Sequence, residues 1–429
     1  MGQLVRPTLP APSRTSPLRI ALLSYRSKPH CGGQGVYVRH LSRELAALGH
    51  DVEVLSGPPY PDLDDVPGVR LTRVPSLDLY REPDPFRIPG WREFRSPVDV
   101  LEFLLMCTAA FPEPLTFSLR ARRELRRRAT RPDVVHDNQT LGYGLLGLQR
   151  DGQHVVATCH HPITVDRVHD LEAARTWRKR LATTRWYSFL RMQRRVLRAL
   201  PAVLTVSRSS ADDIARDFGL PPERLTVVPV GVETDVFVPP TLPRVPGRVV
   251  ATASADVPVK GLVPLLEAVA KLRTERNVEL VVVGKAKPGG PAAATIERLG
   301  LADHVRFVTG VSEAELVAIF GSAQVAVVPS LYEGFSLPAV EVMACATPLV
   351  ATTAGALPEV VGPDGVAALH VAPGDPEALA AAIGRVLDDP ALAARLGAAG
   401  RDRVVELFTW RAVARQTVAW YHATLEEQC

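Results

Sequence analysis

The sequence predicts an α/β protein of two Rossmann-like domains that face each other across a cleft. Three observations lead to this prediction. The chain has 429 residues, which is more than one ordinary domain holds. Apolar runs alternate with helical patterns twice, first from residue 18 and again from residue 248, as in doubly wound parallel sheets. Between the two series lies PPTLPRVPG, residues 239–247, whose four prolines indicate a stiff linker.

The first series begins with LRIALLS, residues 18–24, an apolar run typical of a strand buried on both faces. The glycine-rich loop HCGGQG follows, and apolar residues at helical spacing predict a helix over 36–48. Further strands are expected at DVEVLS and at 134–136, 155–158, 203–206 and 225–229. The Pro-rich stretch 57–113 has no clear period, and we expect an irregular insertion with one or two helices.

The second series predicts strands at 248–254, 278–284, 305–310, 325–330 and 348–352, and helices at 262–274, 292–299, 313–320 and 339–345. From residue 376 the patterns are helical, and these helices could pack on the second half or cross back to the first. The expected organisation is a disordered tail over 1–17, a first domain over 18–240, a second domain over 241–408 and a C-terminal helix over 409–429.

Composition excludes several classes of protein. The net charge of +4 provides no global field for nucleic acid as a partner. The five cysteines are widely spaced and form no CxxC pair, so neither a disulfide framework nor structural zinc is expected, and a reducing, cytoplasmic location is the simple interpretation. No apolar run is long enough to predict a membrane-spanning helix. The oligomeric state is left open.

Two tracts are rich in basic residues. Seven arginines and one acid lie in 120–131, and nine basic residues and no acid lie in 175–198. Either tract could rest on anionic lipid at the inner face of a membrane as a peripheral contact, or could be a solvated helix face. The solvated face is preferred for the first tract. The second contains Trp177, Trp186, Tyr187 and Phe189, which predict that it is partly core.

The segment LYEGFSLPAVEVMACATPLV, residues 331–350, places two carboxylates, Glu333 and Glu341, around a tight turn. A strand should precede the turn and a helix should follow it, with Ser336 as N-cap and Pro338 in the first turn. Free backbone N–H groups at the helix start would bind an anion such as phosphate. The residues expected to offer this site are Gly334, Phe335, Ser336 and Leu337. Carboxylates on either side suit sugar diols, so the arrangement predicts a nucleotide-sugar site.

This segment resembles the E-x7-E motif of retaining glycosyltransferase family 4, whose members have the GT-B fold. The similarity extends over nearly the whole chain. HCGGQGVYVRHLSRELAALGHDVEVLS resembles the family's first glycine loop and helix, TVSRSSADDI and VVPVGVETDVF its domain-closing segments, and ALPEVVG a later helix. The resemblance implies that Glu333 binds donor-sugar hydroxyls and that Glu341 binds the ribose diol. It also implies that Lys260, in the KG pair of VPVKGL, binds the diphosphate.

Two positions depart from the family pattern. Many members carry an arginine five positions before the lysine, where this chain has Ala255. The usual asparagine before the glycine of VVPVGVE is replaced by Val230. Lys260 and the segment 331–350 are therefore expected to be the main contacts to the donor, with Lys285 as a further candidate for a phosphate contact.

The first half contributes a second set of candidates. After the first strand, Gly32, Gly33 and Gly35, with Gln34, would let backbone amides approach a phosphate, while the G-x-G-x-x-G order of a dinucleotide-binding loop is absent. The histidines of ATCHH follow another predicted strand, and the resemblance places His160 against the donor sugar. The candidates for the acceptor site are Asp137, Asn138, Gln139 and His161.

Together these features predict a retaining glycosyltransferase that moves a hexose from a UDP or GDP type sugar to a hydroxyl of a sugar, polyol, lipid or natural product. Glu333, Lys260 and His160 are the expected catalytic residues; 18–240 would bind the acceptor and 241–408 the donor. Asp62, Asp64 and Asp65 lie among prolines and not at a strand end, so a solvated turn is expected there. The resemblance implies transfer without a metal, and no other cofactor is expected. The alternatives are a sugar-nucleotide epimerase of the same fold and a non-catalytic carbohydrate-binding protein.

Overall fold

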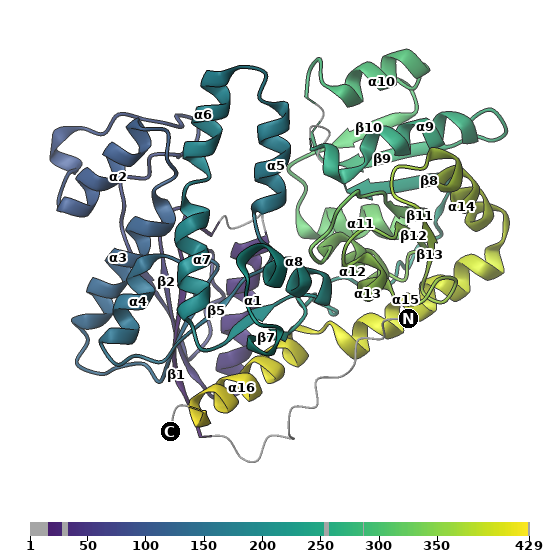
Figure 1. Cartoon of the computed structure of the whole chain (residues 1–429). Coiled ribbons are helices and arrows are strands. Elements are labelled where there is room, and N and C mark those ends of the chain that lie inside the picture. The colour runs from purple at the N-terminus through teal and green to yellow at the C-terminus, as the bar shows by residue number, and fades with distance from the viewer. Residues whose placement is uncertain (1–15, 28–32, 253–256, 286, 428–429) are drawn as a thin grey trace. The chain divides into compact units, whose positions relative to one another are not determined.

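The computed structural model describes residues 16–27, 33–252, 257–285 and 287–427, which form two compact units (Figure 1). The N-terminal unit contains the described residues up to Val206, Ser210–Val228 and the chain from Val413 onward. The C-terminal unit contains Ser207–Ser209 and Pro229–Ala412. Each unit is built on a parallel sheet with helices on its faces, which confirms the prediction of two α/β domains.

The N-terminal sheet has seven parallel strands in the order β3-β2-β1-β4-β5-β6-β7. They are β1 (Arg19–Ser24), β2 (Asp51–Ser56), β3 (Val69–Arg73), β4 (Val134–Asn138), β5 (Val155–Thr158), β6 (Val203–Thr205) and β7 (Leu225–Val227). In the described part of the chain the sequence analysis missed β3, which lies inside the expected insertion. This edge strand reads VRLTR and is partly exposed, so no apolar run marks it.

Helices cover both faces of this sheet (Figure 1). They are α1 (Gly33–Ala47), α2 (Pro97–Cys107), α3 (Glu113–Arg126), α4 (Tyr143–Arg150), α5 (Thr164–Ala173), α6 (Trp177–Trp186), α7 (Phe189–Ala199), α8 (Arg208–Phe218) and α16 (Trp410–Glu426), with short 3₁₀ turns η1 (Trp91–Glu93) and η2 (Pro222–Arg224). One core cluster joins α3, α4 and α7 to the sheet through Phe117, Leu145 and Val196. The predicted first helix starts three residues earlier than expected, at Gly33.

The C-terminal helix α16 belongs to the N-terminal unit from Val413 onward, the second of the two arrangements left open by the sequence. Tyr421 is fully buried, and its hydroxyl lies 2.6 Å from His136 Nδ1. Farther along the helix, Thr424 Oγ1 lies 2.9 Å from His154 Nε2. Because buried polar groups need partners, these two contacts specify where α16 packs.

The C-terminal sheet has six parallel strands in the order β10-β9-β8-β11-β12-β13. They are β8 (Val245–Thr252), β9 (Glu279–Val283), β10 (Val305–Val308), β11 (Ala323–Val328), β12 (Leu349–Thr352) and β13 (Ala368–Val371). The helices are α9 (Leu262–Leu272), α10 (Pro291–Leu299), α11 (Glu313–Ser322), α12 (Leu337–Ala344), α13 (Leu357–Val361), α14 (Pro376–Asp388) and α15 (Pro390–Leu407), with the 3₁₀ turn η3 (Pro258–Lys260).

The expected linker over 239–247 is wrong, and the chain enters the C-terminal unit earlier, at Pro229. Two features hold this stretch inside the unit. Arg244 donates hydrogen bonds to the carbonyls of Gly321, Ala323 and Ala346, and β8 already begins at Val245. Upstream, Val232 N donates to Phe408 O at 2.8 Å. The prolines indicate extended backbone here, but the hydrogen bonds of Arg244 and Val232 place this stretch inside the C-terminal unit.

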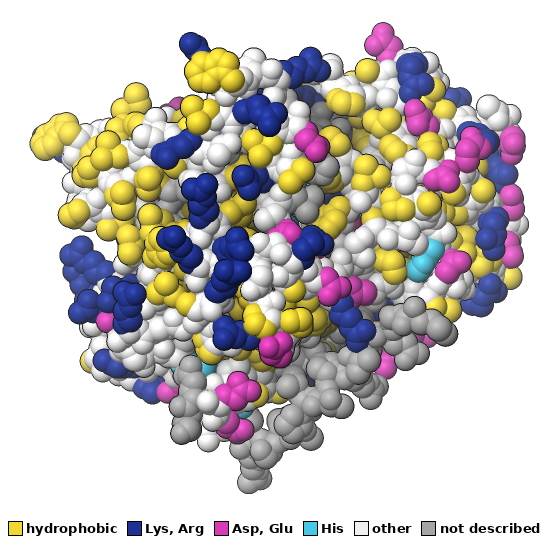
Figure 2. Space-filling view, viewed as in Figure 1, with side chains coloured by type: hydrophobic (Ala, Val, Ile, Leu, Met, Phe, Trp, Pro, Cys, Tyr) yellow, Lys and Arg dark blue, Asp and Glu magenta, His cyan; other side chains and the backbone are white. Residues whose placement is uncertain are grey.

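Part of the first basic tract is paired with acidic residues rather than simply solvated. Arg122 bonds Asp151, and Arg128 bonds Glu53. In the second tract Tyr187 and Phe189 are buried, which confirms that it is partly core. Figure 2 shows Lys and Arg side chains over α3, α6 and α7 and hydrophobic side chains over α2. In the described residues no helix is long and apolar enough to cross a membrane.

Replacing Tyr421 by Phe should destabilise the N-terminal unit by roughly 1–2 kcal/mol, because the buried His136 Nδ1 loses its partner. Urea unfolding measures this loss. Tyr143→Phe is the matched control, since its hydroxyl bonds Arg195 at an exposed position. Equal stability of Tyr421→Phe and the parent protein would contradict the assigned packing of α16.

Candidate functional site

Each sheet has one point at which the strand order reverses, between β1 and β4 in the N-terminal unit and between β8 and β11 in the C-terminal unit. Ligands of open α/β sheets bind at the carboxyl ends of the strands at such a point. In the C-terminal unit, Lys260 follows β8 and Glu333 follows β11. In the N-terminal unit, Gly33 follows β1 and Gln139 follows β4. The sequence-predicted residues therefore fall at both switch points.

The C-terminal switch point holds a compact polar cluster. Lys260 Nζ lies 2.7 Å from Glu333 Oε1, and Ser330 Oγ donates to the same oxygen at 2.7 Å. Glu333 is buried, with 7% of its surface exposed, so its carboxylate depends on these two partners. Among the described residues Glu333 Oε2 has no hydrogen-bond partner, which leaves this oxygen for a ligand hydroxyl.

Three close backbone contacts bring this cluster together. Gly261 adopts φ +66°, and a β-carbon there would lie 1.9 Å from Pro329 O, so the loop after β8 touches the end of β11 only because residue 261 is glycine. Leu331 N also donates to Val259 O at 2.7 Å. On the other side Gly355, at φ +53°, would place a β-carbon 2.2 Å from Glu333 O. Glu333 is thus held between two glycine contacts.

The start of α12 carries an unpartnered hydroxyl. Ser336 occupies the N-cap position, as expected, but its backbone is left-handed at φ +88° and its side chain does not cap the helix. Ser336 Oγ is buried and has no hydrogen-bond partner among the described residues. Pro338 lies in the first turn, as predicted. A buried hydroxyl beside the first-turn N–H groups of a helix is an arrangement that can accept an oxyanion.

The opposite end of α12 is anchored by two arginines. Arg401 donates to Ala344 O at 2.9 Å, and Arg244 donates to Ala346 O at 2.8 Å. Guanidinium groups satisfy the free carbonyls of a helix C-terminus and oppose its negative dipole end. The helix is therefore positioned from its C-terminus while its N-terminus stays open to a ligand.

Glu341 lies on α12, eight residues after Glu333. Burial raises the pKa of its carboxyl group to about 7, and the negative charge of Glu313 adds to the shift. The described residues give this carboxyl no hydrogen-bonding partner. A ligand that donates hydroxyl hydrogen bonds would favour the ionised form.

The N-terminal switch point holds a second cluster. Asn138 Nδ2 donates to Gln34 O at 3.4 Å, which orients the amide so that Asn138 Oδ1 accepts from His160 Nε2 at 2.7 Å. Gln139 binds both sides of the next loop, accepting from His160 N and donating to His161 O. Burial lowers the pKa of His160 to about 3, with His161 contributing, so the ring is neutral and Nδ1 is its acceptor.

Asp137 does not join this cluster, which corrects one part of the acceptor-site prediction. Asp137 and Asn138 were expected in a loop but are the last residues of β4, and neighbouring residues of a strand point to opposite faces. Asp137 is fully buried and its Oδ2 accepts from Leu141 N at 2.8 Å. Burial raises its pKa to about 7. Asp137 therefore holds the turn after β4, whereas His161 is half-exposed.

Other candidates have mixed positions. Gly32 and Ala255 lie outside the described residues, and Lys285 is exposed. Val230 is buried in the C-terminal unit. Asp64 is paired with Arg39, whose Nη2 lies 2.6 Å away. No group of three or more potential metal-binding side chains lies together in the part of the chain that the structure describes.

Sequence reasoning missed two residues of the C-terminal cluster, Ser330 and Gly355. Ser330 ends the apolar run VAVVPS, and a hydroxyl at the carboxyl end of a buried strand was a usable signal. Gly355 gave no such signal, because only the fold shows how closely it approaches Glu333.

Two α/β units, each built on a parallel sheet, are the architecture of the GT-B glycosyltransferases. Family models agree with this class. "Glycosyltransferase Family 4" matches residues 31–236 and "Glycosyl transferases group 1" matches residues 240–403.

Similar proteins cover nearly the whole chain. An "MMP alpha-(1->4)-mannosyltransferase" of Mycolicibacterium hassiacum is 60% identical over 95% of this chain and 98% of its own. A glycogen synthase of Mycobacterium tuberculosis is 30% identical, with 95% of each chain covered. Among solved structures, a sucrose-phosphate synthase from Thermosynechococcus elongatus has a TM-score of 0.70 at 25% identity, over 95% of this chain and 99% of that one. The chain belongs to glycosyltransferase family 4, and it is a glycosyltransferase that acts on sugar-nucleotide donors.

Gly261→Ala should cost at least about 3 kcal/mol of unfolding free energy, because a side chain there meets Pro329 O in addition to the strain of positive φ. Gly300→Ala is the matched control. Gly300 has nearly the same φ, +64°, but nothing lies within 4 Å of the added carbon, so only about 1–2 kcal/mol should be lost. Denaturant unfolding compares the two variants. Equal losses of unfolding free energy would show that the contact with Pro329 O adds nothing to the cost of the substitution.

Glu341→Gln should stabilise the protein at pH 8 by roughly 1–3 kcal/mol relative to its effect near pH 5. The folded-state pKa of about 7 lies above the ordinary 4.5, so the parent loses stability as pH rises from 4.5 through 7 and the amide does not. Urea unfolding at both pH values measures the difference. Glu297→Gln, at an exposed position of α10, controls for removal of a surface carboxylate. A gain that does not change with pH would contradict the assignment.

Proposed function

We propose that the chain is a retaining α-mannosyltransferase, which transfers mannose from a nucleoside diphosphate to a hydroxyl group of a glycan acceptor. The observation that carries the proposal is the cluster of Lys260, Glu333 and Ser330 beside the unpartnered hydroxyl of Ser336. The choice of mannose, and of an α-(1→4) linkage, rests on the 60% identical mannosyltransferase. The epimerase and the non-catalytic binding protein have no support among these relatives.

The donor would lie across the start of α12. Its phosphates would accept hydrogen bonds from the first-turn amides and from Ser336, with the ammonium of Lys260 on the leaving oxygen. Glu333 Oε2 would accept from hydroxyls of the sugar, and Glu341 from the ribose diol. Two carboxylates and one ammonium would thus recognise a ligand that is anionic in the middle and carries hydroxyl groups at both ends.

Lys260 and the helix start would stabilise the charge that develops during transfer. The bond between the anomeric carbon and the phosphate oxygen breaks, and the acceptor oxygen bonds to that carbon on the same face. The acceptor proton moves to the leaving phosphate, so no protein carboxylate acts as nucleophile. Because the ammonium and the helix dipole supply positive charge at the phosphates, we propose that no metal or other cofactor takes part.

His160 would assist through a hydrogen bond to the donor sugar. Its neutral ring offers Nδ1 as an acceptor, since Nε2 donates to Asn138 Oδ1. Asn138 and Gln139 would position this ring, and Gln139 with His161 remain the candidates for the acceptor side. A neutral histidine held in this way serves orientation better than proton transfer at neutral pH.

Lys260→Ala should lower kcat by on the order of 10²-fold or more, because the leaving phosphate loses its cation. GDP-mannose and UDP-glucose are tested with mannoside acceptors, and NMR of the product reports the anomeric configuration. Lys271→Ala is the control, since this exposed lysine of α9 pairs with Glu377. A β-linked product would overturn retention. Isomerised sugar from donor alone would indicate an epimerase, and no binding of any nucleotide-sugar would indicate a non-catalytic protein.

A further inference from the structure

A basic pocket of about 530 Å³ lies at the β3 edge of the N-terminal sheet, within one unit. Its walls come from the segment after β3, the segment 93–99 and helix α3. The charged residues of the lining are Arg73, Glu93, Arg95, Asp99, Arg120, Arg123, Glu124 and Arg127. None of these residues belongs to either switch-point cluster.

Each acid of this lining is already neutralised. Glu93 accepts from Arg87 Nη2 at 2.6 Å, and Asp99 pairs with Arg120 at 2.5 Å. Glu124 lies 3.4 Å from Arg128. Arg87 and Arg128 are not part of the lining, so two of the three acids are compensated from outside the pocket.

Four arginines of the lining keep their full charge. Arg73, Arg95, Arg123 and Arg127 are exposed, and none of them forms an ion pair with a described residue. Arg123 and Arg127 stand four positions apart beside α3, where like charges repel. The pocket thus concentrates uncompensated guanidinium groups, which bind the oxygens of phosphate and carboxylate in pairs.

The arrangement of α3 explains why these arginines gather on one side. Arg120, Arg123 and Arg127 recur at helical spacing and face the pocket, whereas Arg122 and Arg126 face Asp151 on the other side. The first basic tract therefore divides into a paired face and an unpaired face. Ion pairs within the protein explain the arginines of the paired face but not those of the unpaired face.

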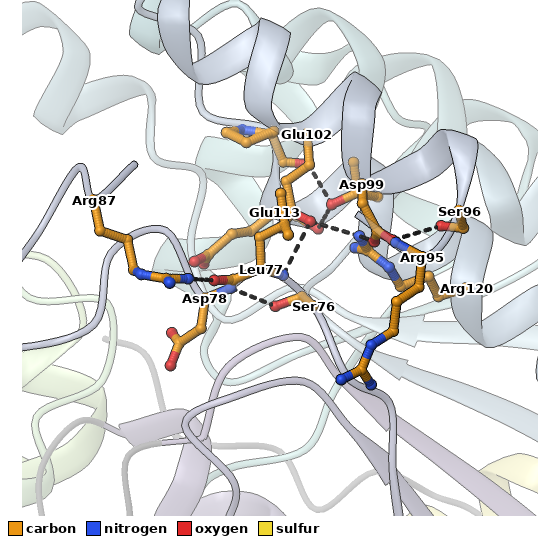
Figure 3. A network of polar contacts seen from close by, with 12 residues as sticks. Ser76, Leu77, Asp78, Arg87, Arg95, Ser96, Asp99, Glu102, Glu113 and Arg120 are labelled. Carbon is orange, nitrogen blue, oxygen red and sulfur yellow. Dashed lines mark hydrogen bonds and ion pairs between the residues drawn. The ribbon is translucent and has the colours of Figure 1, made fainter. Parts of the chain in front are cut away.

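A network of polar contacts joins two lining residues, Arg120 and Asp99, to the buried Glu102 (Figure 3). Arg120 bonds both Asp99 and Glu102, and Glu102 Oε2 accepts from Leu77 N at 3.5 Å. Only 11% of the Arg120 side chain is exposed, and its Nη1 is buried without a partner among the described residues. A buried donor of this kind is costly unless a ligand or water satisfies it.

We propose that this pocket is a second ligand site, which binds a phosphorylated ligand of about the size of a sugar phosphate. Four uncompensated arginines fit more than one negative charge, and a phosphate monoester supplies close to two at neutral pH. The volume admits a sugar ring as well as the phosphate. A free sugar phosphate and a lipid whose headgroup is a phosphate monoester, such as phosphatidic acid, share this chemistry, and the experiment separates them.

The test is calorimetric titration of the full chain with mannose 6-phosphate, using unphosphorylated mannose as the matched ligand. Arg123→Gln/Arg127→Gln should weaken binding on the order of 10-fold or more, because both lost groups make charge-assisted hydrogen bonds. Arg126→Gln, on the paired face, is the matched control and should change affinity less than about 2-fold. Raising the salt concentration should weaken binding to the parent protein.

Folding and the donor site are controlled separately. Because removing Arg123 and Arg127 relieves like-charge repulsion, the double variant should keep or slightly raise its melting temperature without ligand. Lys260→Ala should bind mannose 6-phosphate as the parent does. Phosphatidylcholine vesicles with and without phosphatidic acid form the lipid arm, and binding there alone, lost in the double variant, would identify the headgroup as the source.

The proposal is overturned if neither phosphate source binds, or if binding survives in Arg123→Gln/Arg127→Gln. Loss of binding in Lys260→Ala with retention in the double variant would also overturn it, since the anion would then occupy the donor site.

Discussion

The contact between Gly261 and Pro329 O is the constraint on which the cluster of Lys260 and Glu333, the proposed donor site, depends. It lets the loop after β8 touch the end of β11, and only a residue without a side chain can stand there. Lys260 is the neighbour of that glycine, and Glu333 lies four residues after the proline. The packing of the two loops therefore brings these residues near each other, and their side chains form an ion pair of 2.7 Å.

The two ends of helix α12 differ in their polar contacts. Arg244 and Arg401 neutralise its C-terminal carbonyls, so the helix is anchored from the end that no ligand needs. Its N-terminus keeps free amides and the hydroxyl of Ser336. The packing that makes this end precise also buries Glu341, and the raised pKa of that carboxyl records the cost of holding an acid there.

Much of this could be predicted from the sequence. Apolar runs such as LRIALLS and DVEVLS mark strands because both faces of a parallel sheet are buried. The segment from Glu333 to Glu341 likewise contains the predicted turn and helix start, which we propose as the donor site. The misses have physical reasons. The edge strand β3 has no apolar run, and Ser336 adopts a left-handed backbone, which the N-cap pattern of the sequence does not indicate. Asp137 faces the opposite side from Asn138 because β4 runs two residues longer than its apolar pattern.

The ion pair between Lys260 and Glu333 also explains how both charged groups are stabilised before a donor binds. A buried carboxylate needs a positive partner, and Lys260 serves Glu333 while no donor is bound. A donor phosphate would compete with Glu333 for the ammonium of Lys260. Losing this partner would be unfavourable for the buried carboxylate unless another group replaced it. The sugar of the same donor brings hydroxyls to Glu333, so one ligand supplies both replacements. Phosphate without the sugar offers only one of them, and this asymmetry favours the intact donor over its fragments.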